Sequence, residues 1–316
     1  LYADNISLEL KGNPDSNMNG YGVFVNDGYQ FYQGGMLMDA IVASGTPLAV
    51  AATGPAPADG NPGIQGRTYR DIVQDMVDAY AWAQWDGWPG GGWRYSANEY
   101  PDNSACQWAA IGMIAAERQW GLTVPQWVKD WNVVWLAYTQ DGSGGFGYTD
   151  PGYYPWGPYA TTPSGMVQMC MDGIGRGNVG WPSWDAAETF IRDGFGATGG
   201  ATDALRSYYY GLFSFVKSML YHPGAPIVML HSQTPGVVDV DWYGAEASAG
   251  APMDGVARTL VNAQSGDGYW WGHNVDWNQY HFETAWAIMM LNQTVVEGGR
   301  PRAIAIAIPN PGIVGQ

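Results

Sequence analysis

The sequence predicts an all-helical domain in which helix pairs repeat along the chain and form two concentric layers. Three observations support this prediction. A Gly-rich turn recurs that begins with Gln and leads to an aromatic residue, a helical pattern precedes each turn, and an apolar helical segment follows it. No convincing run of hairpin signals appears in the main body of the chain.

The recurrent turn occurs over residues 83–93, 139–148 and 263–270. Its glycines suit the left-handed conformations that end helices. The turns begin at Gln84, Gln140 and Gln264, and the first two glutamines are 56 residues apart. The longer gap to Gln264 leaves room for two units, and we predict a degenerate turn between them at residues 192–196. A period of this size is typical of helical repeat proteins.

The segments that precede the turns are predicted to be amphipathic outer helices. In the first of them Ile72, Met76 and Tyr80 recur at helical spacing, and Thr68 with Asp71 forms a helix-start signal. The four predicted outer helices cover residues 67–82, 124–138, 184–191 and 253–263.

The segments after the turns are apolar nearly all round, which indicates buried inner helices. The run from Trp108 to Ile114 is an example. The segment at residues 33–44, before the first turn, is predicted to be one further inner helix, whose outer partner is lost or degenerate. The predicted inner helices cover residues 33–44, 104–117, 162–173, 207–221 and 282–291.

The composition indicates an extracellular protein and excludes some partners. Charged residues make up 13% of the 316 residues, about half the usual share, while Gly (45), Trp (17) and Tyr (20) are abundant. The net charge of −16 would repel nucleic acid and anionic membranes and favours divalent cations. No apolar run reaches transmembrane length, and the first residues do not resemble a signal peptide.

Cys106 and Cys170 both fall inside predicted inner helices. We expect them to be free and buried. A single disulfide in an oxidising compartment is the alternative.

The turn resembles the QW motif of squalene–hopene cyclases and of the wider prenyltransferase/squalene-oxidase repeat family, and the chain is most similar to secreted prokaryotic members. The resemblance covers roughly residues 30–292. It implies a closed α/α toroid of inner and outer helices over residues 30–298. It also implies that each Gln caps neighbouring helix ends and that the aromatic residue stacks on it.

The two ends of the chain are predicted to lie outside this repeat. Residues 1–29 are expected to form an N-terminal loop region. In the tail, residues 301–308 alternate small and branched side chains, and residues 309–316 resemble the opening strand of a PKD (immunoglobulin-like) domain. Residues 299–316 are therefore either a linker or the first strand of a following domain.

The catalytic motifs that this resemblance would imply are missing. Asp239-Val240-Asp241-Trp242 is the nearest segment to the Asp-x-Asp-Asp motif of the cyclases, and we expect it to be a polar loop. The histidines show no zinc-ligand spacing and are assigned to the surface or to helix ends. No thioester, nucleophile elbow or phosphate-binding loop is found. The four histidines are His222, His231, His273 and His281.

Two carboxylates at the starts of inner helices, Asp102 and Glu283, are the candidates for catalysis. Glycan-cleaving enzymes need two acidic groups spaced across a sugar, and nearby aromatic rings could stack on sugar faces. The alternative, which we favour, is that both carboxylates stabilise helix N-termini. The candidate ring platform consists of Trp93, Tyr95, Tyr148, Trp156, Trp270 and Trp271.

Asp15, Asn17 and Asn19, followed by Gly20, match the first half of an EF-hand calcium loop. The final bidentate Glu is missing, since Asn26 occupies position 12. A metal-free turn of Asx residues is the alternative. Calcium is the one cofactor that the sequence suggests.

These observations favour a non-catalytic scaffold at the cell surface or outside the cell, which binds copies of itself or other surface proteins. Asn5 and Asn292 lie in glycosylation sequons. A glycan-binding or glycan-cleaving protein that uses the toroid mouth is the alternative. A terpene cyclase-like enzyme is a distant third.

Overall fold

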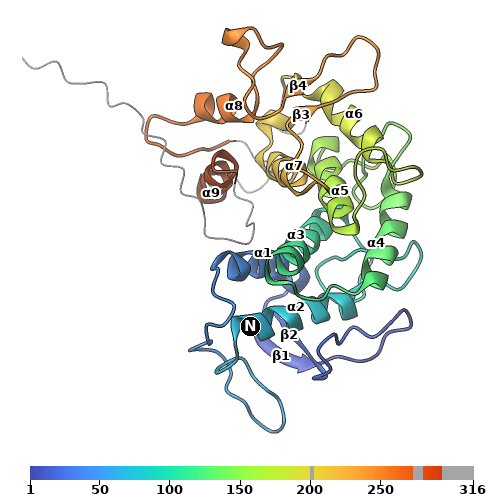
Figure 1. The fold of residues 1–316 in the computed structure, drawn as a ribbon, viewed down its shortest axis with the longest axis vertical. Coiled ribbons are helices and arrows are strands. Elements are labelled where there is room, and N and C mark those ends of the chain that lie inside the picture. Colours follow the sequence, from blue (N-terminus) through green and yellow to red (C-terminus); the bar gives the residue numbers. More distant parts are fainter. Residues whose placement is uncertain (200–202, 273–279, 294–316) are drawn as a thin grey trace, which may run out of the picture.

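The computed structural model describes residues 1–199, 203–272 and 280–293. Helices make up most of its regular structure (Figure 1). The predicted tail strand at 299–316 and His273 lie outside the described residues. The helices are α1 (Gln30–Ala43), α2 (Tyr69–Ala83), α3 (Asn103–Trp120), α4 (Gln126–Thr139), α5 (Pro158–Asp172), α6 (Trp184–Gly194), α7 (Tyr209–Tyr221), α8 (Val256–Ala263) and α9 (Tyr280–Leu291).

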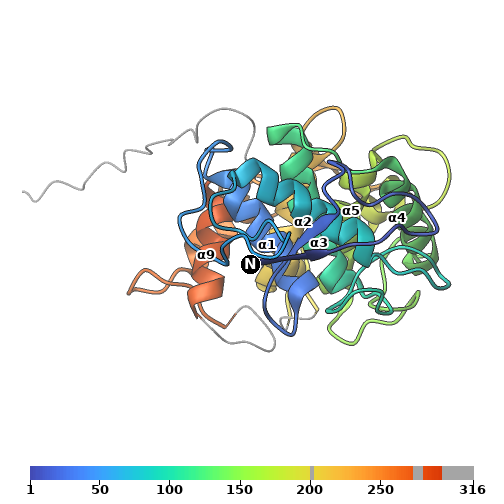
Figure 2. The same ribbon diagram turned by 90° about the horizontal axis from the view of Figure 1, so that it is seen from below.

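Odd-numbered and even-numbered helices have different places in the packing. Helices α1, α3, α5, α7 and α9 form one series in which each contacts the next. The even-numbered helices pack on this series: α2 on α1 and α3, α4 and α6 on α5, and α8 on α9. The predicted alternation of helices along the chain is thus confirmed. In both views α4 and α9 lie at opposite sides of the molecule, and α9 is on the same side as α1 (Figures 1 and 2).

Local signals explain where several helices begin and end. The Thr68 hydroxyl accepts a hydrogen bond from the Asp71 backbone N–H (3.1 Å), which confirms the predicted start of α2. Asp102 caps α3 and Ser183 caps α6 in the same way. Gly121 ends α3 in a left-handed conformation. Side-chain caps satisfy backbone donors that have no partner inside the helix.

Glycines allow the series of odd-numbered helices to pack closely. A Cβ atom at Gly35 of α1 would lie 2.0 Å from the Trp108 carbonyl oxygen of α3, and one at Gly211 of α7 would lie 1.9 Å from the Tyr159 carbonyl oxygen of α5. Any larger residue at either position would force the two backbones apart. These glycines therefore determine how closely α1 approaches α3 and α7 approaches α5.

The sequence suggested that residues 1–29 form a loop region, but the structure also has a pair of strands there. Strands β1 (Tyr2–Asn5) and β2 (Tyr21–Phe24) pair antiparallel, with Tyr2 opposite Phe24, and β2 packs on α2. Val23 and Phe24 belong to the same hydrophobic core as the helices. This strand pair precedes α1, where an outer helix was predicted to be lost. A second antiparallel pair consists of two short strands of two residues each, β3 (Met229–Leu230) and β4 (Val240–Asp241).

Side chains fill the space between α1, α3 and α7. The Tyr32 and Tyr210 hydroxyls are 3.3 Å apart, and the ring centroids of Trp108 and Phe213 are 6.0 Å apart. Further along, the buried Lys217 ammonium lies 3.3 Å from the carboxylate of Asp39 on α1. Within the described part of the chain, no helix is both long and apolar enough to cross a membrane.

Candidate functional site

Asp102, the first candidate carboxylate, is fully buried at the N-terminus of α3. One of its oxygens accepts from the Ser104 hydroxyl (2.5 Å) and the Ala105 N–H (2.9 Å). The other accepts from the Tyr148 hydroxyl (3.2 Å) and lies 3.3 Å from the Arg94 guanidinium. Burial raises the pKa of Asp102, although these four donors counteract the shift. Both oxygens are engaged, so Asp102 acts here as a helix cap.

A layer of tyrosines surrounds Asp102 at this end of the inner helices. The Tyr210 hydroxyl donates to the Ser104 carbonyl oxygen (2.9 Å). The Tyr95 ring meets Tyr29 edge-on at 4.9 Å, and Tyr29 is 54% exposed. Burial raises the pKa of Tyr32 to about 12, so this phenol remains a protonated donor at neutral pH. Sequence analysis missed Tyr29, Tyr32 and Tyr210, although tyrosines recur at the starts of α1 and α7.

Glu283 is also fully buried, in the first turn of α9. Burial, and then the charge of Glu283, raise the pKa of Tyr209. Burial and several nearby groups, Asp102 among them, raise the pKa of the adjacent Tyr210. The two candidate carboxylates therefore lie near consecutive tyrosines of α7, at the same end of the inner helices.

The structure separates the six predicted platform aromatics into two groups. Trp93 and Trp270 are core residues, whose indole N–H groups donate to the carbonyl oxygens of Tyr80 (2.7 Å) and Leu260 (2.8 Å). Neither ring has a face available for a sugar, which corrects that part of the prediction. The other four retain exposed surface: Tyr95 and Tyr148 are half-buried, and Trp156 and Trp271 are exposed.

The predicted calcium loop lies against α2. Asp15 accepts hydrogen bonds from the backbone N–H groups of Asn19 (3.1 Å) and Gly20 (2.8 Å). The side-chain amides of Asn17 (2.6 Å) and Asn19 (2.9 Å) donate to the carboxylate of Asp75, which is fully buried. The loop is thus a compact Asx-rich turn that places the predicted ligands beside an acidic residue from a distant part of the sequence.

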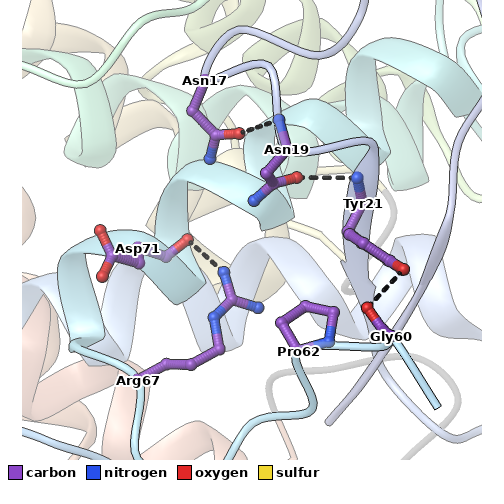
Figure 3. Close-up of a pocket in the computed structure, with 7 residues that line it drawn as sticks. All are labelled: Asn17, Asn19, Tyr21, Gly60, Pro62, Arg67 and Asp71. Atoms are coloured by element: carbon purple, nitrogen blue, oxygen red, sulfur yellow. Dashed lines mark hydrogen bonds between the residues drawn. The ribbon is translucent and has the colours of Figure 1, made fainter. Parts of the chain in front are cut away.

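A pocket of about 410 Å³ opens next to this loop (Figure 3). Asn17, Asn19, Arg67 and Asp71 are among its lining residues. Arg67 bridges it to the buried acid, with its guanidinium 2.6 Å from the Asp75 carboxylate. The figure shows Asn17 and Asn19 on one side of the pocket and Arg67 on the other.

A second buried carboxylate, Asp78, follows Asp75 by one helical turn. One of its oxygens accepts from the Gln74 amide (3.0 Å), and the other has no partner within hydrogen-bond distance. Burial raises the pKa of Asp78 to about 7, and the charge of Asp75 adds to that shift. Sequence analysis missed Asp75 and Asp78, because charged residues on an outer helix ordinarily face water.

The histidines considered as metal ligands and the two cysteines make ordinary structural contacts. Among the described residues, no group of three His, Cys, Asp or Glu side chains gathers to hold a metal. His222 ends α7, as expected, and its ring meets Trp184 edge-on. His231 pairs with Asp239 at 2.7 Å on the surface. Cys106 and Cys170 are both free and buried, so the favoured prediction for them is confirmed.

The repeat turns connect successive outer helices. The Gln140 side chain accepts from the Ser183 N–H (2.7 Å) and donates to the Ser183 carbonyl oxygen (2.9 Å), at the start of α6. Gln84 donates to the Val128 carbonyl oxygen of α4 (2.9 Å). At the degenerate turn the aromatic position is Phe195, which is fully buried against Phe215. A buried Gln at each of the first two turns therefore links the unit to the next outer helix.

No protein-family model matches this sequence, and no curated protein or solved structure is significantly similar to it.

Proposed function

We propose that this chain is a non-catalytic, self-associating scaffold whose helices close into an α/α toroid. The observation that supports this most directly is the third repeat turn. This turn has the same internal hydrogen bonds as the second turn, but the side chain of Gln264, which corresponds to the helix-linking Gln140, faces solvent.

The toroid is supported by the continuous contacts along the odd-numbered helices and by the even-numbered helices packed on them. Side chains of α1 reach α7 at two levels, through Tyr32–Tyr210 and Asp39–Lys217. A series of helices whose first member contacts its fourth must curve strongly. Helix α9 also lies on the same side of the molecule as α1 (Figure 1). These features favour a ring over an open solenoid.

The first two turns show what the third one lacks. A Cβ atom at Gly91 would lie 2.2 Å from the Trp131 carbonyl oxygen of α4, and one at Gly144 would lie 2.2 Å from the Ala186 carbonyl oxygen of α6. Each turn thus fits closely against the next outer helix. At the corresponding Gly268, no atom of the described residues lies within 4 Å of such a Cβ.

Large apolar side chains are exposed on the third turn and on the flanking helices α8 and α9, alongside exposed polar residues such as Asn262 and Asp267. Gln264 itself is exposed, and Val261 (53%), Tyr269 (37%), Tyr280 (47%) and Ile288 (48%) expose large parts of their side chains. Exposed apolar groups that cluster at one end of a repeat series are typical of association surfaces.

We assign this surface to a second copy of the chain. In the first two turns the Gln side chain binds the backbone near the N-terminus of the next outer helix. The partner expected for Gln264 is therefore the same part of an outer helix. Within the described residues, the segment before α1 is the β1–β2 pair and not an outer helix. In the proposed assembly, an outer helix of another molecule of the same protein occupies this position. A low charged fraction and exposed sequon residues at Asn5 and Asn292 suit a secreted or surface-attached protein.

Sedimentation velocity over a range of concentrations tests this proposal. The wild type should self-associate, and a Val261→Glu, Gln264→Ala double variant should remain monomeric with an unchanged circular dichroism spectrum. Val179→Glu, at a fully exposed loop position, is the matched control and should behave as the wild type does. A monomeric wild type at all concentrations would contradict the proposal.

Glycan binding at the tyrosine-lined end is a second candidate, favoured by the exposed Tyr29 ring beside Tyr95 and by the neighbouring Arg94–Glu99 pair. Binding to a glycan array that is lost in Tyr29→Ala would support it. Hydrolysis of a polysaccharide that is lost in Asp102→Asn or Glu283→Gln, with folding intact, would replace the scaffold proposal with an enzyme. A terpene cyclase is disfavoured by the side chains that fill the space between α1, α3 and α7.

A further inference from the structure

A tight hairpin that follows β1 exposes two leucines. The backbones of Glu9 and Gly12 exchange hydrogen bonds of 3.2 and 3.3 Å, which close the hairpin. Leu8 is 77% exposed and Leu10 is 99% exposed. Single exposed leucines are ordinary on protein surfaces, so the surroundings of this pair decide whether it has a role.

The hairpin is fixed to the first repeat turn and to the start of α4. The Lys11 ammonium donates to the Trp85 carbonyl oxygen (3.1 Å) and pairs with Asp86. A Cβ atom at Gly12 would lie 2.3 Å from the indole nitrogen of Trp127, in the first turn of α4. These contacts hold the backbone that carries the two leucines against the protein while their side chains face water.

Tryptophans surround the hairpin and enlarge its apolar surface. Trp88, two residues beyond Asp86, is 78% exposed. The partly exposed Trp82 donates from its indole to the Ser7 hydroxyl (3.2 Å). We call residues 7–12 together with Trp88 the hairpin surface. Exposed leucines beside tryptophans are typical of surfaces that bind another protein.

The hairpin surface and the third turn lie on opposite sides of the molecule. The hairpin packs on α4, where the Lys11 ammonium is 4.4 Å from the centre of the Trp131 ring. The third turn packs on α9, where the Trp270 N–H donates to the Thr284 hydroxyl (3.1 Å). Helices α4 and α9 are on opposite sides in both views (Figures 1 and 2). The two surfaces therefore cannot cover each other within one molecule, but they can do so between two molecules.

The charges at both surfaces suit a contact between copies. Molecules that each carry a net charge of −16 repel one another, so they meet most easily where charges are few or paired. In the hairpin surface Lys11 is paired with Asp86, and on α8 Arg258 is paired with Glu246.

We infer that copies of this chain associate head to tail, with the third turn of one molecule on the hairpin surface of the next. This inference rests on the proposed self-association and specifies the second surface of that contact. The start of α4 lies beside the hairpin, and the turn glutamines bind the starts of outer helices in the first two units. A contact between two different surfaces leaves one of each free at the ends, so it builds a chain or ring of molecules and not a symmetric pair.

Variants that each block one surface distinguish this arrangement from a symmetric pair. Leu8→Asp with Leu10→Asp blocks the hairpin surface, and Val261→Glu with Gln264→Ala blocks the third turn. In sedimentation velocity, each variant alone should associate at least about tenfold more weakly than the wild type. An equimolar mixture should form a heterodimer of about twice the monomer mass and nothing larger, because each variant keeps the surface that the other lacks.

Leu48→Asp with Val50→Asp is the matched control, since it adds the same charge at two exposed apolar positions (77% and 55%) beside the start of α2. It should associate as the wild type does, and all variants should keep the wild-type circular dichroism spectrum. An equal loss in this control would show a general effect of charge and overturn the inference.

Unchanged association of the hairpin variant, or a mixture that stays monomeric, would overturn the head-to-tail arrangement and leave self-association through the third turn in place. A wild type that is monomeric at all concentrations would overturn both.

Discussion

The turn at 140–146 and the turn at 264–270 have the same internal hydrogen bonds, 124 residues apart in sequence. Gln140 donates to the Gly144 carbonyl oxygen (3.0 Å), and Gln264 donates to that of Gly268 (2.9 Å). The backbone N–H of the aromatic residue donates to a Thr hydroxyl of the next inner helix at 3.1 Å in both turns. The second turn also bonds to α6 through Ser183, whereas the third bonds to no further outer helix in the described part of the chain.

This difference separates two roles of one motif. The local bonds shape the turn and direct its aromatic residue into the core, and they form in both of these turns. The link to a neighbouring helix depends on whether that helix is present. At the end of a repeat series, a turn whose Gln has no outer helix to bind is a natural site for association. Terminal repeats must otherwise be capped by polar residues.

Alanine at the turn glycines should give the largest contrast between the two turns. Gly144→Ala adds the strain of a positive φ of 94° to an overlap with the α6 backbone, so we expect it to cost about 4 kcal/mol. Gly268→Ala has the strain alone and should cost about 1 kcal/mol. Urea unfolding of both variants measures the difference. Equal costs would show that the two turns are equally constrained.

The first unit, whose outer face is covered by the 15–20 loop, should respond to pH through Asp78. Its folded-state pKa of about 7 lies above the ordinary value near 4. Its contribution to stability is therefore complete below pH 4 and is lost as the pH rises to 7. Asp78→Asn should match the wild type at pH 4 and be more stable by up to about 3 kcal/mol at pH 7.

Unfolding at several pH values in EGTA tests this expectation, with Asp71→Asn as the control. A wild type that is more stable than Asp78→Asn at pH 7 would reverse the sign and show that the ionised carboxylate is stabilised in the fold.

Removing the glutamines should give the smallest contrast. Gln140→Ala loses its local bond to Gly144 and two bonds to Ser183 in a buried setting, and it should cost about 2 kcal/mol. Gln264→Ala loses one exposed local bond and should cost about 0.5 kcal/mol. Thermal unfolding of dilute monomer measures both values. A cost for Gln264→Ala as large as that for Gln140→Ala would place a helix partner on the third turn within the same molecule.

Most of the helices could be predicted, because their signals are local. The segment predicted at 104–117 is the helix Asn103–Trp120, and the one predicted at 253–263 is Val256–Ala263. The β1–β2 pair was missed because strands of four residues carry little periodicity. The buried Lys217–Asp39 pair was missed because its members are 178 residues apart.

The candidate sites were predicted less well, for a related reason. The sequence correctly places Asp102 at the start of an inner helix, but exposure decides whether a carboxylate meets a substrate, and exposure depends on neighbours such as Arg94 and Tyr148. Likewise, the sequence contains the Asp15–Gly20 loop without showing that Asp75 lies beneath it.

The sequence by itself determined the alternation of amphipathic and apolar helices, the Gln-to-aromatic turns, and the glycines with positive φ. All of these depend on residues within a few positions of one another, through backbone sterics, capping and helical periodicity. Only the tertiary structure decided that Gln84 and Gln140 are buried while Gln264 is exposed, and that Asp75 and Asp78 share their surroundings with the N-terminal loop. Those outcomes depend on the summed packing of helices far apart in the chain, and no local pattern specifies which surfaces remain once packing is complete.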